Sequence, residues 1–187
     1  MQMIRRSVIS VFLILILIMS AGQVFAHSTS VTFNGEYVDV AAVIVEDRTL
    51  LPARDIVDLL GGSIYWDEEL RQVTILQDDI HILITIDSET AVVDNETVYL
   101  DVPAQIINDR TKVPLRFVAE SLGVNVDFVD GTVVIDEMVW LSATGVRWHA
   151  VSDCGNMIPE RARLVTLQYA RASLEVDGPC SICNPPE

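Results

Sequence analysis

The feature that most constrains this chain is an internal repeat in its middle. The segment "EDRTLLPARDIVDLLGGSIYWD", residues 46–67, aligns without a gap with "NDRTKVPLRFVAESLGVNVDFV", residues 108–129, at an offset of 62 positions. Such self-similarity indicates one structural unit present twice, so the fold has to accommodate two copies. Seven of the 22 aligned pairs are identical: Asp47/Asp109, Arg48/Arg110, Thr49/Thr111, Pro52/Pro114, Arg54/Arg116, Leu60/Leu122 and Gly61/Gly123.

Each copy predicts the same succession of elements. A β-rich stretch precedes the DRT motif, and a proline then stands where the first turn of a helix is expected. Apolar residues follow at helical spacing, and a glycine stands where a left-handed residue ends a helix before the next strand. The expected apolar helix faces are Ile56, Leu59 and Leu60 in the first copy, and Phe117, Val118 and Leu122 in the second.

The flanking residues predict strands. Asn34-Gly35 and Asp130-Gly131 each interrupt alternating apolar residues, which is a strong signal for a two-residue hairpin turn. In "IHILITI" isoleucines from Ile80 to Ile86 alternate on one face of a strand. We therefore expect an α+β fold, with a tandem-repeat antiparallel sheet curled around short helices, followed by a small zinc-stabilised tail module.

This tandem pattern resembles the copper amine oxidase N-terminal (stalk) domain over about residues 30–137, most specifically in "NDRTKVPLRFVAESLGVNVDF". The resemblance implies a small antiparallel sheet twisted around a helix, without catalytic residues. The oxidase itself would need several copper-binding histidines, whereas the chain has only His27, His81 and His149, which form no compact cluster in the sequence. We therefore expect no oxidase activity, and no other catalytic constellation is apparent.

Each of the two helices expected in the repeat carries a pair of opposite charges. Arg54 and Asp58, and likewise Arg116 and Glu120, stand four residues apart, which places each pair on one helix face. A ligand-binding arginine is one interpretation. A structural ion pair is the favoured one, because duplication of the same residues fits a requirement of the fold better than a single binding site.

The N-terminal 26 residues predict a signal peptide. Arg5 and Arg6 precede a short apolar run, residues 8–19, and small residues end at Ala26, so cleavage is expected before His27. An uncleaved anchor is the alternative. The chain is then secreted and cell-wall associated, outside the cytoplasm. Its formal net charge of −15 opposes attraction to nucleic acid or to an anionic membrane face.

The C-terminal segment, residues 138–187, holds all three cysteines of the chain. His149, Cys154, Cys180 and Cys183 follow the spacing His-x4-Cys-x25-Cys-x2-Cys. Three chemistries compete. A disulfide leaves one thiol unpaired, and a redox pair would need a helix after Cys180, where the chain soon reaches two prolines. Zinc uses all four residues as a closed tetrahedral set, so structural Zn²⁺ is the favoured interpretation.

This tail also resembles a small metal-binding module related to the Ada-type zinc-binding fold. The matching positions include Gly145, Trp148, Pro179 and Pro185 around the four expected ligands, whereas "LEVDG" replaces the usual tight turn before Pro179. The resemblance implies a closed structural site. A helix is expected over "PERARLVTLQYARASL", residues 159–174.

The expected domains are a signal peptide (1–26), a repeat domain (27–137) and a Cys3His metal module (138–187). The expected function is a secreted, non-catalytic binding or scaffold protein of the cell envelope, whose partner is a cell-wall polymer or another envelope protein. An accessory subunit or inhibitor of a secreted enzyme, or a zinc-dependent extracellular enzyme, is the alternative. Trp66, Trp140, Trp148 and Tyr65 are candidate contact aromatics if they are exposed.

Overall fold

The computed structural model describes residues 29–143, 146–155, 157–173 and 177–186, so the expected signal peptide lies outside the described residues. The described chain is mostly β, with four sheets and a few short helices. The helices are α2 (Ala53–Leu60), α3 (Leu115–Ser121), α4 (Leu167–Ala172) and the 3-10 helix η1 (Pro159–Arg161).

The strands form three sheets before Glu137 and one after it. In spatial order the first sheet is β12 (Asn125–Val129), β13 (Thr132–Asp136), β1 (Ser30–Phe33) and β2 (Glu36–Val38). The second is β10 (Gln105–Ile107), β11 (Arg110–Pro114), β4 (Arg48–Pro52) and β3 (Val43–Val45). The third is β5 (Ser63–Asp67), β6 (Gln72–Gln77), β7 (Ile80–Thr85), β8 (Thr90–Val93) and β9 (Glu96–Tyr99). The fourth is β16 (Arg163–Thr166), β14 (Met138–Leu141), β15 (Arg147–His149) and β17 (Gly178–Pro179).

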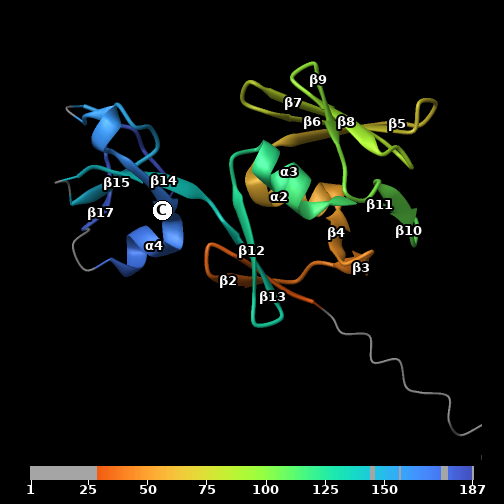
Figure 1. The fold of residues 1–187 in the computed structure, drawn as a ribbon, viewed down its shortest axis with the longest axis horizontal. Helices are drawn as coiled ribbons and strands as arrows, with labels where there is room; N and C mark the ends of the chain where they lie inside the picture. The colour runs from red at the N-terminus through yellow and green to blue at the C-terminus, as the bar shows by residue number, and fades with distance from the viewer. Residues whose placement is uncertain (1–28, 144–145, 156, 174–176, 187) are drawn as a thin grey trace, which may run out of the picture.

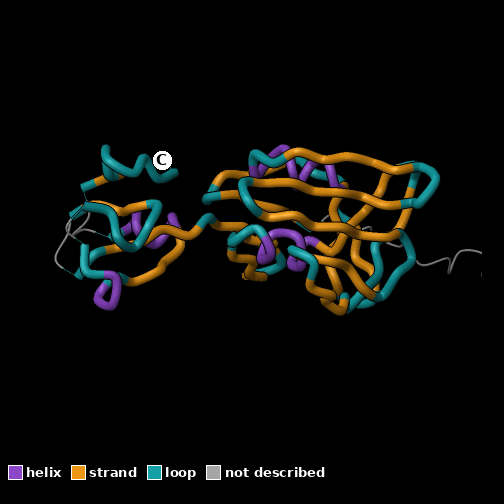
Figure 2. The backbone as a smooth tube through the Cα atoms, turned by 90° about the horizontal axis from the view of Figure 1, so that it is seen from above, coloured by secondary structure: helices purple, strands orange, loops and turns teal. Residues whose placement is uncertain are grey.

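We refer to residues 29–136 as the body and to residues 138–186 as the tail. Within the body, α2 and α3 lie at the centre, with the third sheet on one side and the first and second sheets on the other (Figure 1). The tail lies beside the body, and the chain reaches it through the connection from β13 to β14 (Figures 1 and 2). One apolar core fills the body, and a separate small core fills the tail.

The two copies carry the same order of elements, whose first residues are 62 positions apart as far as β5 and β12 and 60 apart for β6 and β13. The order β3–β4–α2–β5–β6 is matched by β10–β11–α3–β12–β13. Between them, β4 and β11 pair antiparallel so that Leu51 lies opposite Val113, its own counterpart in the alignment. The two segments are thus related by a local two-fold axis at this pair, and both helices pack from there into the shared core.

Backbone geometry explains the turns. Asn34-Gly35 and Asp130-Gly131 all have positive φ, as a type I′ hairpin turn requires, and both hairpins form as expected. Gly61 and Gly123 have φ of 75° and 78° at the helix ends, also as expected.

Two expectations about the strands need correction. The first and fourth sheets are mixed, because β1 pairs parallel with β13 and β15 pairs parallel with β17, whereas the second and third sheets are antiparallel as expected. Pro52 and Pro114 are the last residues of strands and cap the helices instead of lying in their first turn, since both pair in the β4–β11 ladder.

The helix expected over residues 159–174 is shorter than predicted. Residues 163–166 form β16, which pairs along the whole of β14, and the helix begins only at Leu167. The Thr166 hydroxyl accepts a hydrogen bond from the Tyr169 backbone N–H at 3.2 Å and caps the helix there. Tertiary pairing therefore overrides the helical propensity of this segment.

Candidate metal centre

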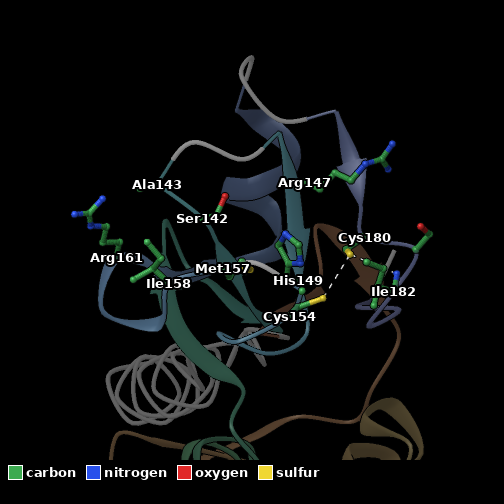
Figure 3. Close-up of a pocket in the computed structure, with 12 residues that line it drawn as sticks. Ser142, Ala143, Arg147, His149, Cys154, Met157, Ile158, Arg161, Cys180 and Ile182 are labelled. Carbon is green, nitrogen blue, oxygen red and sulfur yellow. Dashed lines mark hydrogen bonds between the residues drawn. The ribbon is translucent and has the colours of Figure 1, made fainter.

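Strand pairing brings the distant cysteines next to the histidine. His149 ends β15, and Cys180 follows β17, which lies parallel to β15 with Trp148 opposite Pro179. The Cys180 backbone N–H donates to the Trp148 carbonyl at 2.9 Å, which extends the pairing to the cysteine itself. Cys154 approaches from the loop after β15, and Figure 3 shows its sulfur facing that of Cys180 with His149 beside them.

The four predicted ligands lie together. One ligand atom from each of His149, Cys154, Cys180 and Cys183 lies within 4.8 Å of all the others. The Cys154 and Cys180 Sγ atoms are 3.7 Å apart, and the Cys183 Sγ atom is 3.7 Å from His149 Nδ1. All three cysteines are free thiols in this structure.

These separations suit a tetrahedral zinc ion. Zn–S bonds of about 2.3 Å at tetrahedral angles place neighbouring sulfurs about 3.8 Å apart, close to the 3.7 Å between Cys154 and Cys180. A disulfide would need those sulfurs at about 2.05 Å. The residues present therefore fit a group of four soft and borderline ligands around one metal ion.

Backbone N–H groups, one in the turn between the last two cysteines and one directly after His149, donate to the sulfurs. The Ile182 N–H donates to Cys180 Sγ at 3.4 Å, and the Ala150 N–H donates to Cys183 Sγ at 3.3 Å. The Asn184 N–H donates to the Cys180 carbonyl at 3.1 Å and closes the turn. Such N–H groups stabilise negative charge on sulfur, which is the state that binds metal.

The pKa values show how protons distribute over the cluster. Backbone N–H donors from Ile182 and Cys183 lower the pKa of Cys180. A hydrogen bond with the Cys183 thiol, together with burial and the neighbouring Cys180, raises the pKa of Cys154 to about 12. Burial lowers the pKa of His149, which keeps its ring neutral and able to coordinate. Three thiolates this close need a cation, because their mutual repulsion otherwise retains protons.

A hollow of about 450 Å³ lies beside the cluster and is lined in part by His149, Cys154 and Cys180. Arg147 and Arg161 also line it, but both side chains point away from the cysteines in Figure 3. The Arg147 Nη1 group donates to the Pro179 carbonyl at 2.9 Å. The arginines therefore lie at the periphery of the cluster.

Trp148 is the main support of the site. It is 6% exposed and packs with Leu141, Leu167 and Ala170 in the tail core. Its indole N–H donates to the Pro186 carbonyl at 2.8 Å, which fixes the chain after the last cysteine. The resemblance places Trp148 beside the expected ligands, but its hydrogen bond to Pro186 was not predicted from the sequence.

The other candidate aromatics differ in exposure. Tyr65 and Trp66 are 60% and 40% exposed on the edge strand β5, whereas Trp140 is half-buried in β14. The predicted ion pair between Arg116 and Glu120 forms at 3.3 Å on exposed side chains. No equivalent pair of Arg54 with Asp58 is present in the described residues.

A second set of contacts, missed from the sequence, joins body and tail. Asn34 Nδ2 donates to Glu137 Oε2 at 2.7 Å, and the Glu137 N–H donates to Asn34 Oδ1 at 3.0 Å. Gln168 Nε2 donates to Asp136 Oδ1 at 2.7 Å, and Arg171 donates to the Asn34 carbonyl at 3.1 Å. The Asn34-Gly35 turn, which the sequence predicts only as a hairpin, is thus also the surface on which α4 rests.

Comparison with known families bears on the body. The family model for the copper amine oxidase N-terminal domain matches residues 32–136, which is more than half of the chain. The chain belongs to this family. The matched region of the copper amine oxidase N-terminal domain coincides with the three sheets and two helices of the body. The metal cluster lies outside it.

One curated relative also matches. The chain is similar to a protein named "Protease inhibitor" from Brevibacillus choshinensis, with 26% identity over 123 residues. The match covers 64% of this chain and 38% of that relative, so the chain spans well under half of the relative's length. Among the described residues, no helix is long and apolar enough to cross a membrane.

Proposed function

We propose that the protein is a non-catalytic binding protein that acts outside the cytoplasm, with a zinc ion that stabilises its tail. The observation that carries the metal assignment is the set of four ligand atoms within 4.8 Å of one another. His149, Cys154, Cys180 and Cys183 would hold the ion. A bound zinc ion with four protein ligands supplies structural stability and leaves no position for a reacting water.

The tail needs such an ion because its own core is small. Among the described residues of the tail, only five buried ones make up its apolar cluster: Val139, Leu141, Trp148, Leu167 and Ala170. Segments of this size are commonly stabilised by a metal or by disulfides, since the apolar area they bury does not offset the entropy lost on folding.

Metal analysis of the purified protein tests this part of the proposal. We expect about one zinc per chain, and no zinc in Cys180→Ser, because three remaining ligands bind far more weakly. Ser181→Ala is the matched control, since Ser181 is the neighbouring exposed residue of the same turn. A protein free of metal, with two of its cysteines oxidised to a disulfide, would refute the zinc assignment.

The binding role rests on the family and on the relative. The copper amine oxidase N-terminal domain is expected to lack catalytic residues, and the similar protein from Brevibacillus choshinensis is named a protease inhibitor. We therefore propose that the partner is another protein of the cell envelope or its surroundings, and that inhibition of a secreted protease is the form this binding takes.

An inhibition assay tests the binding role. Purified serine, cysteine and metalloproteases of secreted origin are incubated with the protein, and residual hydrolysis of a small fluorogenic substrate is followed. We expect a saturable loss of activity for one class, with the protein itself remaining intact on a gel. Full activity of every class, combined with no association in surface plasmon resonance, would contradict the proposal. Rapid cleavage of the protein would instead show that it is only a competing substrate.

A further inference from the structure

A groove of about 940 Å³ lies on the body, and none of the four metal-ligand residues lines it. Its floor includes the buried apolar side chains of Leu115, Val126 and Val133. Its rim carries Tyr99 and Phe128, which are 81% and 64% exposed. Large exposed aromatics beside an apolar floor mark an interaction site more often than an ordinary surface.

Each of the body's three sheets has an edge strand that contributes a residue to this groove. β12 is the edge of the first sheet, β3 of the second and β9 of the third. Phe128, Ile44 and Tyr99 line the groove from these three strands in turn. An edge strand carries unpaired backbone N–H and C=O groups, which can accept another strand.

The groove lies over one face of the β12–β13 hairpin, where Val133 pairs with Phe128, and also reaches the free edge of β12. Consecutive side chains of a strand point to opposite faces of its sheet. Val126, Asp127 and Phe128 are consecutive, yet all three line the groove. The free edge of this strand, opposite its partner β13, therefore borders the groove.

The charges on the rim are mostly negative. Arg48 is paired with Asp101 at 2.7 Å, and Arg116 with Glu120 at 3.3 Å. Asp47 and Asp127 also line the groove, and neither forms an ion pair in the described residues. Four carboxylates against two guanidinium groups give the rim a net charge of −2.

We propose that this groove binds an extended segment of a partner protein, which adds as a strand to the edge of β12. Alternate apolar side chains of the segment lie on the groove floor, and flanking lysine or arginine side chains face Asp47 and Asp127. The inference rests on the proposed role as a binding protein and names the surface and the chemistry of the partner.

An extended polypeptide fits these features better than a second copy of the chain or a glycan. A second copy would bring its own acidic rim, in a chain whose formal net charge is −15, and the two would repel. A glycan has no regular ladder of backbone donors and acceptors to match an edge strand. A basic and apolar peptide segment matches the edge, the floor and the charge together.

A displayed library of random linear peptides tests the proposal on the full metal-loaded chain. We expect enrichment of sequences with apolar residues at alternate positions, flanked by lysine or arginine and free of proline. A synthetic peptide from this set should bind about tenfold more weakly to Phe128→Ala, as for a central interface aromatic. Asp127→Lys should weaken binding further and reduce its dependence on salt.

Tyr65→Ala provides the matched control. Tyr65 is 60% exposed, similar to Phe128, but lies on the edge strand β5 and does not line the groove. Equal binding to wild type, Phe128→Ala and Tyr65→Ala would overturn the proposal, as would a lack of enrichment. Competition by soluble peptidoglycan fragments, or a dimer abolished by Phe128→Ala in sedimentation, would assign the groove to a glycan or a second copy instead. Association with a protease that survives both Phe128→Ala and Asp127→Lys would leave the binding role intact and refute only this surface.

Discussion

The junction of body and tail allows a sharp prediction at Asn34. This residue has φ of 50°, and its side chain makes two hydrogen bonds with Glu137, at 2.7 and 3.0 Å. Asn34→Ala removes both bonds and places a non-glycine residue without a polar side chain in the left-handed region. Asn34→Gly removes the same bonds but adopts positive φ without strain.

The two variants separate two contributions to stability. The bond to the charged Glu137 carboxylate is worth about 1.5–3 kcal/mol and the bond from its N–H about 1 kcal/mol. Because both groups are half-exposed, we take the lower values and expect Asn34→Gly to lose about 2 kcal/mol. Alanine adds about 1 kcal/mol for the left-handed backbone, so Asn34→Ala should lose about 3 kcal/mol.

Urea unfolding followed by tryptophan fluorescence measures these losses, since Trp140 and Trp148 lie in the tail. Asp130 provides the control, because it occupies the equivalent turn with φ of 49° and is exposed. Asp130→Gly should be nearly neutral, and Asp130→Ala should lose about 1 kcal/mol. If Asn34→Gly were as stable as the wild type, the Glu137 contacts would not hold the tail on the body and the reasoning would fail.

Three further predictions concern burial. Burial raises the pKa of Asp136 above its ordinary value, so wild-type stability should fall as pH rises above about 4, where the unfolded carboxyl ionises. Asp136→Asn keeps an oxygen acceptor for Gln168 and should lack this fall, which thermal unfolding at pH 4 and pH 7 will detect. Leu167 is fully buried in the tail core, so Leu167→Ala should cost about 2–5 kcal/mol in urea unfolding, and a smaller loss than Leu164→Ala on the exposed surface would contradict it. A Cβ at Gly62 would lie 3.0 Å from the Leu76 carbonyl oxygen, so Gly62→Ala should lower the free energy of unfolding by about 1–3 kcal/mol; an unchanged melting temperature would show that the contact relaxes.

Local signals in the sequence predicted much of the body. The two Asn/Asp-Gly turns and the two helix-ending glycines adopt positive φ as expected, because this requirement is set within two or three residues. Ile82 and Ile84 of β7, and Ile86 directly after it, are buried at alternate positions for the same reason. The turns at 46–47 and 108–109, which contain the repeated aspartates, also have positive φ, but without a glycine they gave no recognisable signal.

Long-range pairing could not be predicted in the same way. The parallel pairing of β1 with β13 joins residues about a hundred positions apart and depends on both copies of the repeat being folded. Residues 163–166 have a helical pattern yet form a strand, since β14 offers them a complete ladder.

The chemistry of the candidate site and its assembly therefore have different origins. The sequence by itself determined the ligand types and their spacing, because soft sulfur donors with one imidazole suit few uses other than a zinc ion or a disulfide. Only the tertiary structure decided that the four residues meet, through the β15–β17 pairing and Trp148, and that three sheet edges border one groove. The physical reason is that the chemistry of each ligand is set by its own side chain. Whether the ligands meet depends on strand pairing between segments that are distant in the chain.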